Sequence, residues 1–319
     1  MEQNVSRRAL LGAAIGTGAA AAVAPSALAR GKSGQSNGRA ANNRVPRNRR
    51  GIQLYTLRRL TPNQAGARNV LRALGRMGYT EVEKFTTYDW TVEQFSRELD
   101  RAGLRCVSGH DGPGFPAAAG WEDAYRESLE YAAGLGQEFT GLAWFGGSEV
   151  PYDVEDTWHR LADHLNAAGE IARREFGLQF FYHNHNFEFA NQFNGRPAYD
   201  ILLAETSRRF VKFQLDLFWI TEGGGNGVKY LSADPGRFVS YHVKDHVWGD
   251  RPNAEDWEDA GPGMLDFPDL FDAGDGRNGQ LDKHYFIEHD DPTLSHPGDP
   301  EAELTTAKVG IKYLESVRW

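Results

Sequence analysis

The sequence is poor in cysteine and in positive charge, and each shortage excludes a group of properties. Cys106 is the only cysteine among 319 residues, so no disulfide can form within the chain. Residues 1–50 contribute +8 to the total net charge of −9, so residues 51–319 carry −17. An acidic body repels phosphate backbones, which argues against nucleic acid as a partner and favours a small neutral ligand.

The first 29 residues have the layout of an export signal. Arg7 and Arg8 precede a weakly hydrophobic run of mostly alanine and glycine, and an Ala-Leu-Ala segment at 27–29 resembles a cleavage site. We therefore predict a twin-arginine signal peptide over 1–29, recognised by the export machinery, and a periplasmic or extracellular location. A transmembrane anchor is the alternative, but Pro25 and the many glycines disfavour it.

A basic linker is predicted to follow this signal. Residues 30–50 contain seven lysines or arginines, no acidic residue and almost nothing apolar, so they cannot bury a core and should be disordered. The lack of a disulfide agrees with twin-arginine export, which carries folded proteins. A metal could therefore be acquired before the protein is exported.

From residue 51 onwards, short apolar runs alternate with amphipathic segments of helical period, several of which end in glycine where a helix C-cap belongs. Eight such runs are predicted strands: 52–57, 80–85, 104–110, 139–145, 178–185, 211–220, 238–245 and 284–290. Eight strands separated by helices predict an α/β fold of the (β/α)8 TIM barrel type over 51–319.

The strand ends separate this barrel from a doubly wound open sheet. The open sheet usually has a glycine-rich phosphate loop after its first strand, and the segment after 52–57 has none. Polar residues stand at the C-terminal end of nearly every predicted strand, where a barrel would bring them to one mouth. These residues are Glu83, His110, His183, His185, Asp216, His242, Lys244, Glu288 and Asp290.

Three of these residues are candidate metal ligands. Asp216, His242 and Glu288 each end an apolar strand, where an unpaired charge would be costly. One divalent cation such as Mn, Co, Zn or Mg would satisfy all three, because carboxylate and imidazole together suit such ions. The alternative is a set of separate salt bridges at the barrel rim, with Lys244 or Arg58 as partners.

The motifs of the chain resemble those of the xylose isomerase-like barrel superfamily, whose members are often called sugar phosphate isomerases/epimerases. The resemblance covers residues 51–319 and rests on YHNHNFEF, LDLFW, HVKD, IEHD, GIQLYTLR, GYTEVEKF and GPGMLDFPDLF. It implies one divalent metal held by four ligands, commonly Glu, Asp, His and Glu on strands five to eight. By this resemblance, Asp216, His242 and Glu288 take the last three places.

The first ligand place departs from the family pattern. His183 stands where the family has glutamate, and Glu188 lies farther along the chain. Family members with a Glu-x-His motif use the glutamate on the metal and the histidine for proton transfer. We therefore predict His183 as the fourth ligand and His185 as the general base on the same strand face, with Glu188 as the alternative for either role.

The remaining strand ends supply further candidates. Lys244 is predicted as an additional catalytic group, and Glu83, His110 and Trp219 as substrate-binding groups. Four tryptophans lie at or just beyond strand ends, where their rings would suit the C–H faces of sugars, with core packing as the alternative. They are Trp90, Trp144, Trp219 and Trp248.

Such a site favours reactions that begin with removal of a proton next to a carbonyl, which a metal polarises for a positioned His or Glu. Return of the proton gives epimerisation or isomerisation, and loss of a β-substituent gives elimination. The acidic, exported body favours a non-phosphorylated sugar or keto-sugar. We predict a metal-dependent sugar isomerase or epimerase. A lyase acting on 3-keto glycosides and a non-catalytic sugar-binding barrel are alternatives, and the charge disfavours an abasic-site endonuclease.

Overall fold

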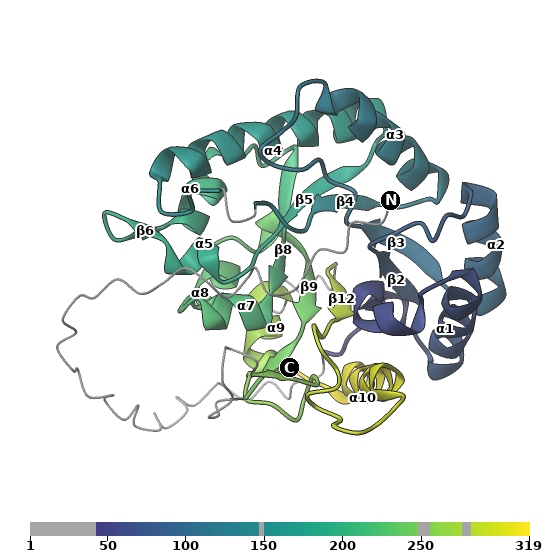
Figure 1. The fold of residues 1–319 in the computed structure, drawn as a ribbon. Coiled ribbons are helices and arrows are strands. Elements are labelled where there is room, and N and C mark those ends of the chain that lie inside the picture. Colours follow the sequence, from purple (N-terminus) through teal and green to yellow (C-terminus); the bar gives the residue numbers. More distant parts are fainter. Residues whose placement is uncertain (1–42, 147–149, 248–255, 276–281) are drawn as a thin grey trace, which may run out of the picture. The chain divides into compact units, whose positions relative to one another are not determined.

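Within residues 43–146, 150–247, 256–275 and 282–319, which the computed structural model describes, the chain forms the predicted barrel (Figure 1). Eight parallel strands make one sheet in the order β3-β2-β1-β12-β9-β8-β5-β4. Their bounds are β1 Arg50–Gln53, β2 Glu81–Lys84, β3 Arg105–Gly109, β4 Phe139–Leu142, β5 Gln179–His183, β8 Val211–Asp216, β9 Phe238–Val243 and β12 His284–Ile287.

The two ends of this sheet, β3 and β4, approach one another and nearly close the barrel. The backbone N–H of Glu138 donates to Val107 O at 2.8 Å, and that of Gly112 donates to Gly141 O at 2.7 Å. Closure of this kind brings all eight C-terminal strand ends to one mouth.

Helices surround the strands, as Figure 1 shows for α1 to α4. Helices α1 and α2 end as expected at Gly78 and Gly103, whose φ angles of 108° and 69° favour glycine. None of the described helices combines the length and apolar character needed to cross a bilayer. The bounds are α1 Gln64–Met77, α2 Val92–Ala102, α3 Trp121–Gly134, α4 Glu155–Glu175, α5 Phe187–Ala190, α6 Ala198–Glu205, α7 Leu217–Glu222, α8 Gly227–Ala233, α9 Phe267–Asp275 and α10 Ala302–Ser316.

Short elements complete the fold. Two antiparallel ribbons are formed by β6 with β7 and by β10 with β11. In the described part of the chain, three short 3-10 helices precede or follow barrel strands. The bounds are β6 Gln192–Phe193, β7 Arg196–Pro197, β10 Asp245–His246, β11 Trp257–Glu258, η2 Arg47–Arg49, η3 Leu54–Leu60 and η4 Pro235–Arg237.

Two predicted strands are shorter than expected because their apolar runs continue into helices. The run 52–57 turns into η3 after β1, and the run 211–220 turns into α7 after β8. At the second turn the Asp216 side chain accepts a hydrogen bond from the backbone N–H of Trp219 at 2.8 Å and so caps α7. Apolar composition alone does not distinguish a buried strand from a buried short helix.

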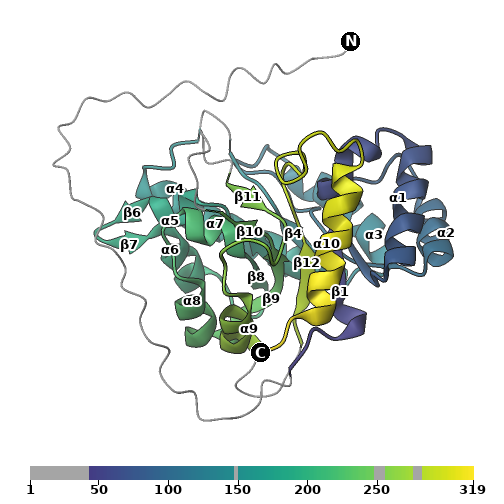
Figure 2. The ribbon, with the colours of Figure 1, turned by 90° about the horizontal axis from the view of Figure 1, so that it is seen from below.

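The ordered chain begins before residue 51, so the predicted linker extends too far. Val45 is fully buried, and the backbones of Asn43 and Trp319 exchange hydrogen bonds of 3.1 and 3.3 Å. This pairing lies near α10, which runs along β1 and β12 (Figure 2). Residues 43–50 were predicted to be disordered because they are basic, but they contain the buried Val45 and form several backbone hydrogen bonds. The predicted signal peptide and the rest of the linker lie outside the described residues.

The barrel interior is filled by aromatic side chains opposite small residues. A Cβ on Gly51 would come within 2.4 Å of Phe286, and one on Gly141 within 2.4 Å of Phe181. These pairs are direct strand neighbours, so glycine on one strand makes room for phenylalanine on the next. The packed interior leaves the polar strand ends at the mouth as the place for chemistry.

Candidate metal centre and active site

Three of the predicted ligands converge at the C-terminal ends of adjacent strands. Asp216 ends β8, His242 lies opposite it on β9, and Glu288 directly follows β12. Each offers a ligand atom within 4.8 Å of the others, and all three side chains are buried. The structure therefore brings together three side chains that are far apart in the sequence.

The donor set fits a divalent cation. Asp216 Oδ2 and Glu288 Oε2 are buried and share one positive group, the Lys244 ammonium, at 3.2 and 2.5 Å, so these two carboxylates together keep an excess of negative charge. Burial, followed by the charge of Asp290, raises the pKa of Glu288, so an added cation would relieve an unfavourable ionisation. Two carboxylates and an imidazole suit Mn, Co or Zn.

Lys244 supplies positive charge at the same carboxylates, as the salt-bridge alternative requires. Its Nζ lies 2.5 Å from Glu288 Oε2, 2.6 Å from Asp290 Oδ2 and 3.2 Å from Asp216 Oδ2. Burial lowers the pKa of Lys244, but these carboxylates outweigh burial and hold it well above its usual value. Lys244 is therefore a charged hydrogen-bond donor and cannot accept a proton. Arg58 donates instead to the backbone oxygen of Asp290, at 2.5 Å.

Glu83 lies in a dense hydrogen-bond network inside the barrel. Its Oε1 accepts from Gln53 Nε2 at 2.7 Å and lies 2.6 Å from His242 Nε2. Its Oε2 accepts from Ser108 Oγ at 2.6 Å and from Gln214 Nε2 at 2.7 Å. Both carboxylate oxygens are therefore occupied by protein groups.

The substrate-binding role of Glu83 stays a prediction, and its side chain also contacts the ring of His242. The side chain has no exposed surface. Burial raises the pKa of Glu83, but the charges of His110 and His242 outweigh burial and hold it well below its usual value. By binding Nε2 of His242, Glu83 leaves Nδ1, 3.7 Å from Asp216 Oδ2, to face the ligand cluster.

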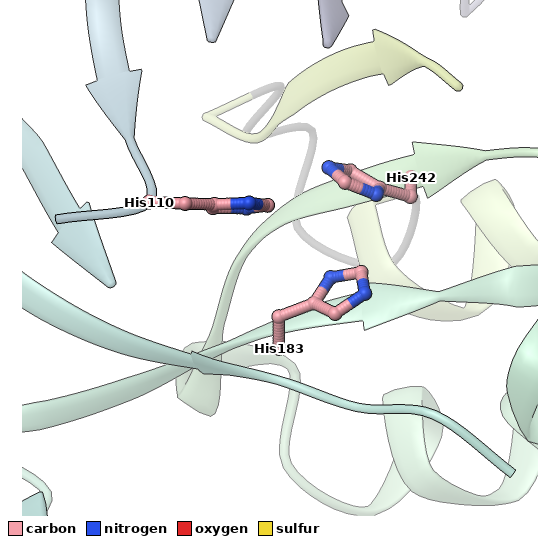
Figure 3. Close-up of side chains that lie close together, drawn as sticks. All are labelled: His110, His183 and His242. Carbon is pink, nitrogen blue, oxygen red and sulfur yellow. The ribbon is translucent and has the colours of Figure 1, made fainter. Parts of the chain in front are cut away.

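His183 belongs to a second, overlapping cluster with His110 and His242, which Figure 3 shows extending from separate strands towards a common space. Its ring centroid is 4.6 Å from that of His242, and its Nε2 is 4.0 Å from Asp216 Oδ2. Burial, followed by the charge of His242, lowers the pKa of His183 well below its usual value, and neutral imidazole is the form that binds metals. The predicted fourth ligand thus lies beside the three-residue set.

His185 lies close to His183 as predicted, at 5.0 Å between ring centroids, although β5 ends before it and strand alternation does not apply. Its ring stacks on Phe187 at 5.6 Å and meets Trp144 edge-on at 4.8 Å. Its Nδ1 is buried without a hydrogen-bond partner among the described residues. Burial lowers the pKa of His185 to about 3, so the ring is neutral, and a pKa this low makes it a weak proton acceptor unless a bound substrate or ion changes its surroundings.

Glu188, the alternative metal ligand or base, belongs to none of the ligand groups found among the described residues, and that role stays a prediction. Its Oε1 accepts from the Tyr182 hydroxyl at 2.6 Å, and its Oε2 accepts from the backbone N–H of His185 at 2.9 Å. The side chain is fully buried, and burial raises the pKa of Glu188 to about 7. Glu188 therefore holds the backbone of His185 in place.

The tryptophans predicted to meet sugar divide into two groups. Trp144 is 51% exposed beside His185, and Trp219 is half-buried 5.5 Å from the same ring. Trp90 is buried against Tyr88 and Phe95 and belongs to the core, which is the alternative given for these tryptophans. Trp248 lies outside the described residues.

The remaining predicted substrate-binding residue is His110, whose side chain is 13% exposed. It keeps contact with the site through Glu83, at 3.1 Å, and Gln214, at 3.3 Å. Like Trp144 and Trp219, it keeps part of its surface accessible.

Sequence reasoning missed two glutamines that connect the site. Gln214 Oε1 lies 2.9 Å from His183 Nδ1, and Gln53 binds Glu83. A signal was present for Gln214, because it precedes Asp216 by two residues in one strand and so faces the same side. Both residues are neutral amides, so they do not stand out among the ionisable residues at the strand ends.

The fold and this site define a class of protein: a (β/α)8 barrel with candidate metal ligands at the C-terminal ends of its later strands. The chain belongs to the xylose isomerase-like TIM barrel family, whose sequence model matches residues 71–309. The predicted family is therefore confirmed.

Three proteins similar to this chain show how it compares with individual relatives. Inosose dehydratase of Bacillus licheniformis is 32% identical over 97 residues, which is 30% of this chain and only 31% of that protein. A sugar phosphate isomerase/epimerase of Parabacteroides distasonis superposes with a TM-score of 0.65 at 24% identity, over 84% of this chain and 93% of that one. The zinc-bound IolI protein gives 0.64 at 16% identity, over 84% and 98%. At these identities the structural matches establish the fold.

Proposed function

We propose that this protein removes a proton next to a carbonyl of a non-phosphorylated sugar or keto-sugar, and returns it to give an isomer or epimer. The observation that carries the proposal is the placement of His185 next to His183, which in turn lies 4.0 Å from Asp216 in the converging set Asp216, His242 and Glu288. A base next to a Lewis-acid site is what enolisation requires.

Each residue of the site has a distinct role in this proposal. Asp216, His242 and Glu288 would hold a divalent ion, with His183 next to them, and the ion would polarise the substrate carbonyl. His185 Nδ1 would accept the proton, because it lies next to the ligand set and lacks a competing hydrogen bond among the described residues.

Three charged groups support this arrangement. Glu188 fixes the backbone of His185, and Glu83 fixes the ring of His242. Lys244, which is charged and lies at the same carboxylates, can donate to a substrate oxygen that gains negative charge. Removing any one of these groups would disturb a neighbouring functional side chain.

The substrate class follows from the accessible edge of the site. Trp144 and Trp219 flank His185 with aromatic surface, which suits the apolar face of a sugar ring. The net charge of −17 over residues 51–319 disfavours a phosphorylated substrate. Export by the twin-arginine route is part of this proposal and agrees with a substrate met outside the cytoplasm.

Elimination is the second candidate reaction. The local similarity to a protein named inosose dehydratase favours it, because loss of water next to a carbonyl begins with the same proton removal. A lyase cleaving 3-keto glycosides would expel a glycosyl group at that step. The same residues would act, and only the leaving group would differ.

The test is proton exchange. Metal-loaded protein is incubated in deuterated water with ketoses, keto-sugars and 3-keto glycosides, and deuterium incorporation and products are followed by NMR. We expect deuterium on the carbon next to the carbonyl, and none with a His185→Ala variant that still binds metal. A wild-type protein that binds metal and these sugars without exchange or product would support a sugar-binding barrel instead.

A further inference from the structure

A second group of metal-ligand side chains lies at the opposite end of α7 from Asp216. Glu222 is the last residue of α7, His246 ends β10, and Asp256 directly precedes β11. Each offers a ligand atom, and these atoms all lie within 4.8 Å of one another. The group is independent of the reaction proposed above and was not expected from the sequence.

This group is separate from the first cluster. Asp216 caps the N-terminus of the six-residue helix α7 and Glu222 ends it, so a rise of 1.5 Å per residue places them roughly 9 Å apart along the axis. The ring of Phe218 stacks on His246 at 5.1 Å and lies 5.5 Å from Lys244 Nζ, so it stands between the two groups. Bridged two-metal centres need about 3.5–4 Å between ions, so two ions here would not share a ligand.

Protein hydrogen bonds alone hold the backbone around His246 and Asp256 in place. The Asp245 carboxylate accepts four backbone N–H groups at 2.8 to 3.0 Å, those of His246, Gly261, Gly263 and Leu265. The backbone N–H of Val247 donates to Asp256 O at 2.9 Å. A site whose ligands are already positioned loses little conformational freedom when an ion binds.

The charges of the group match a divalent cation. His246 is fully buried, and Glu222 contacts its Nε2. Asp256 Oδ1 is buried without a hydrogen-bond partner among the described residues. Two carboxylates would balance the charge of one divalent ion, which an imidazole nitrogen also suits, and the ion would satisfy that oxygen.

We propose that Glu222, His246 and Asp256 bind a second divalent cation, of the type that accepts mixed imidazole and carboxylate ligands, such as Zn, Mn or Co. This ion joins the end of α7 to the β10–β11 ribbon. Trp257 of that ribbon lies 6.2 Å from Trp219 of α7, so the ion also fixes one aromatic side of the barrel mouth. A plain hydrogen bond between Glu222 and His246 is the alternative, and it needs no ion.

The experiment is metal counting by mass spectrometry on the full chain, loaded with Zn or Co and dialysed. We expect about two ions per wild-type chain, and about one in the Asp216→Asn/Glu288→Gln double variant, which keeps the second site. Glu222→Gln and Asp256→Asn should each lose one ion, and combining either with the double variant should leave none. Circular dichroism and melting curves establish that each variant is folded.

A matched control is available on the surface. His159 Nδ1 and Glu205 Oε2 form an exposed pair at 2.7 Å with the same chemistry, but the pair belongs to none of the ligand groups found in the described residues. Glu205→Gln should therefore leave the ion count unchanged. If folded Glu222→Gln and Asp256→Asn both keep the wild-type count, the second site does not exist. Loss of an ion in these two variants while the double variant keeps every ion would support the second site and contradict the first.

Discussion

The assignment of two neighbouring histidines to different tasks predicts two different failures. His183→Ala removes a ring that lies 4.0 Å from Asp216 Oδ2 and 4.6 Å from the His242 ring. We expect it to weaken metal binding, with activity partly recovered by excess metal, because the ligands Asp216, His242 and Glu288 remain. His185→Ala removes the proton acceptor and should leave metal occupancy unchanged.

The size of the second effect follows from the environment of His185. The ring is buried between Phe187 and Trp144, and the nitrogen that would accept the proton has no partner among the described residues. Loss of a positioned general base lowers turnover by about two to four orders of magnitude, or roughly 3–5 kcal/mol in the barrier. Some loss of stability is also expected, because the substitution leaves a cavity beside aromatic rings.

The assay measures metal content, substrate affinity, turnover and deuterium exchange on the same preparations. His185→Ala should keep metal and substrate affinity while losing turnover and exchange together. The reasoning fails if His185→Ala is mild while Glu188→Gln shows the large loss of turnover. Glu188 would then be the base, and its bonds to Tyr182 and the His185 backbone would have to open during the reaction.

Three further predictions concern the metal, the pH dependence of stability and export. Asp216→Ala and Glu288→Ala should each lose the ion of the first cluster without unfolding the barrel, and elemental analysis showing full occupancy in both would leave salt bridges to Lys244 as the explanation. Burial raises the pKa of Asp275 to about 7 from 3.8, so its folded form favours the proton, and stability is lost as pH rises from about 4 to 7. Asp275→Asn can still accept from Tyr285, and it should raise the free energy of unfolding relative to the wild type. Denaturant titrations should show that this increase is larger at pH 8 than at pH 4, by up to about 4 kcal/mol. An equal effect at both pH values would contradict this. Replacing Arg7 and Arg8 by lysine should leave uncleaved precursor in the cytoplasm, whereas the unmodified protein should have a mature N-terminus near Arg30 by peptide sequencing. Normal export of the lysine variant would remove the basis for the signal.

The barrel could be predicted because its strands are apolar runs with polar residues at their C-terminal ends. Closure of the sheet brings those ends together independently of the loop conformations. Asp216, His242 and Glu288 meet for this reason alone. The sequence could not show where the strands stop. Burial on all sides keeps the apolar pattern running from β8 into α7, and only the hydrogen bond from Trp219 N–H to Asp216 marks the change.

The sequence indicated which residues gather at the site better than it indicated what each of them does. Glu83 and Glu188 both follow or end predicted strands, as the ligands do, yet each has its two oxygens occupied by protein donors. Whether a carboxylate is free or occupied depends on residues that come near only in the folded chain, such as Gln214 for Glu83 and Tyr182 for Glu188. Spacing in the sequence carries no information on such contacts.

The charge balance of the mouth explains why Lys244 and a metal ion need not exclude one another. Glu83, Asp216 and Glu288 are buried carboxylates, and Asp290 adds a fourth charge at the edge. Lys244 neutralises one of these charges, and its closest contacts are Glu288 and Asp290, while Asp216 Oδ2 is farther away at 3.2 Å. Burial lowers the pKa of His242, but Glu83 and Asp216 outweigh burial and raise it to about 9, so a charged His242 offsets Glu83. Burying the negative charge that still remains without a counterion would be costly. A divalent ion held by Asp216, His242 and Glu288 would balance that charge and leave Lys244 paired with Asp290, where its ammonium could still donate to a substrate oxygen.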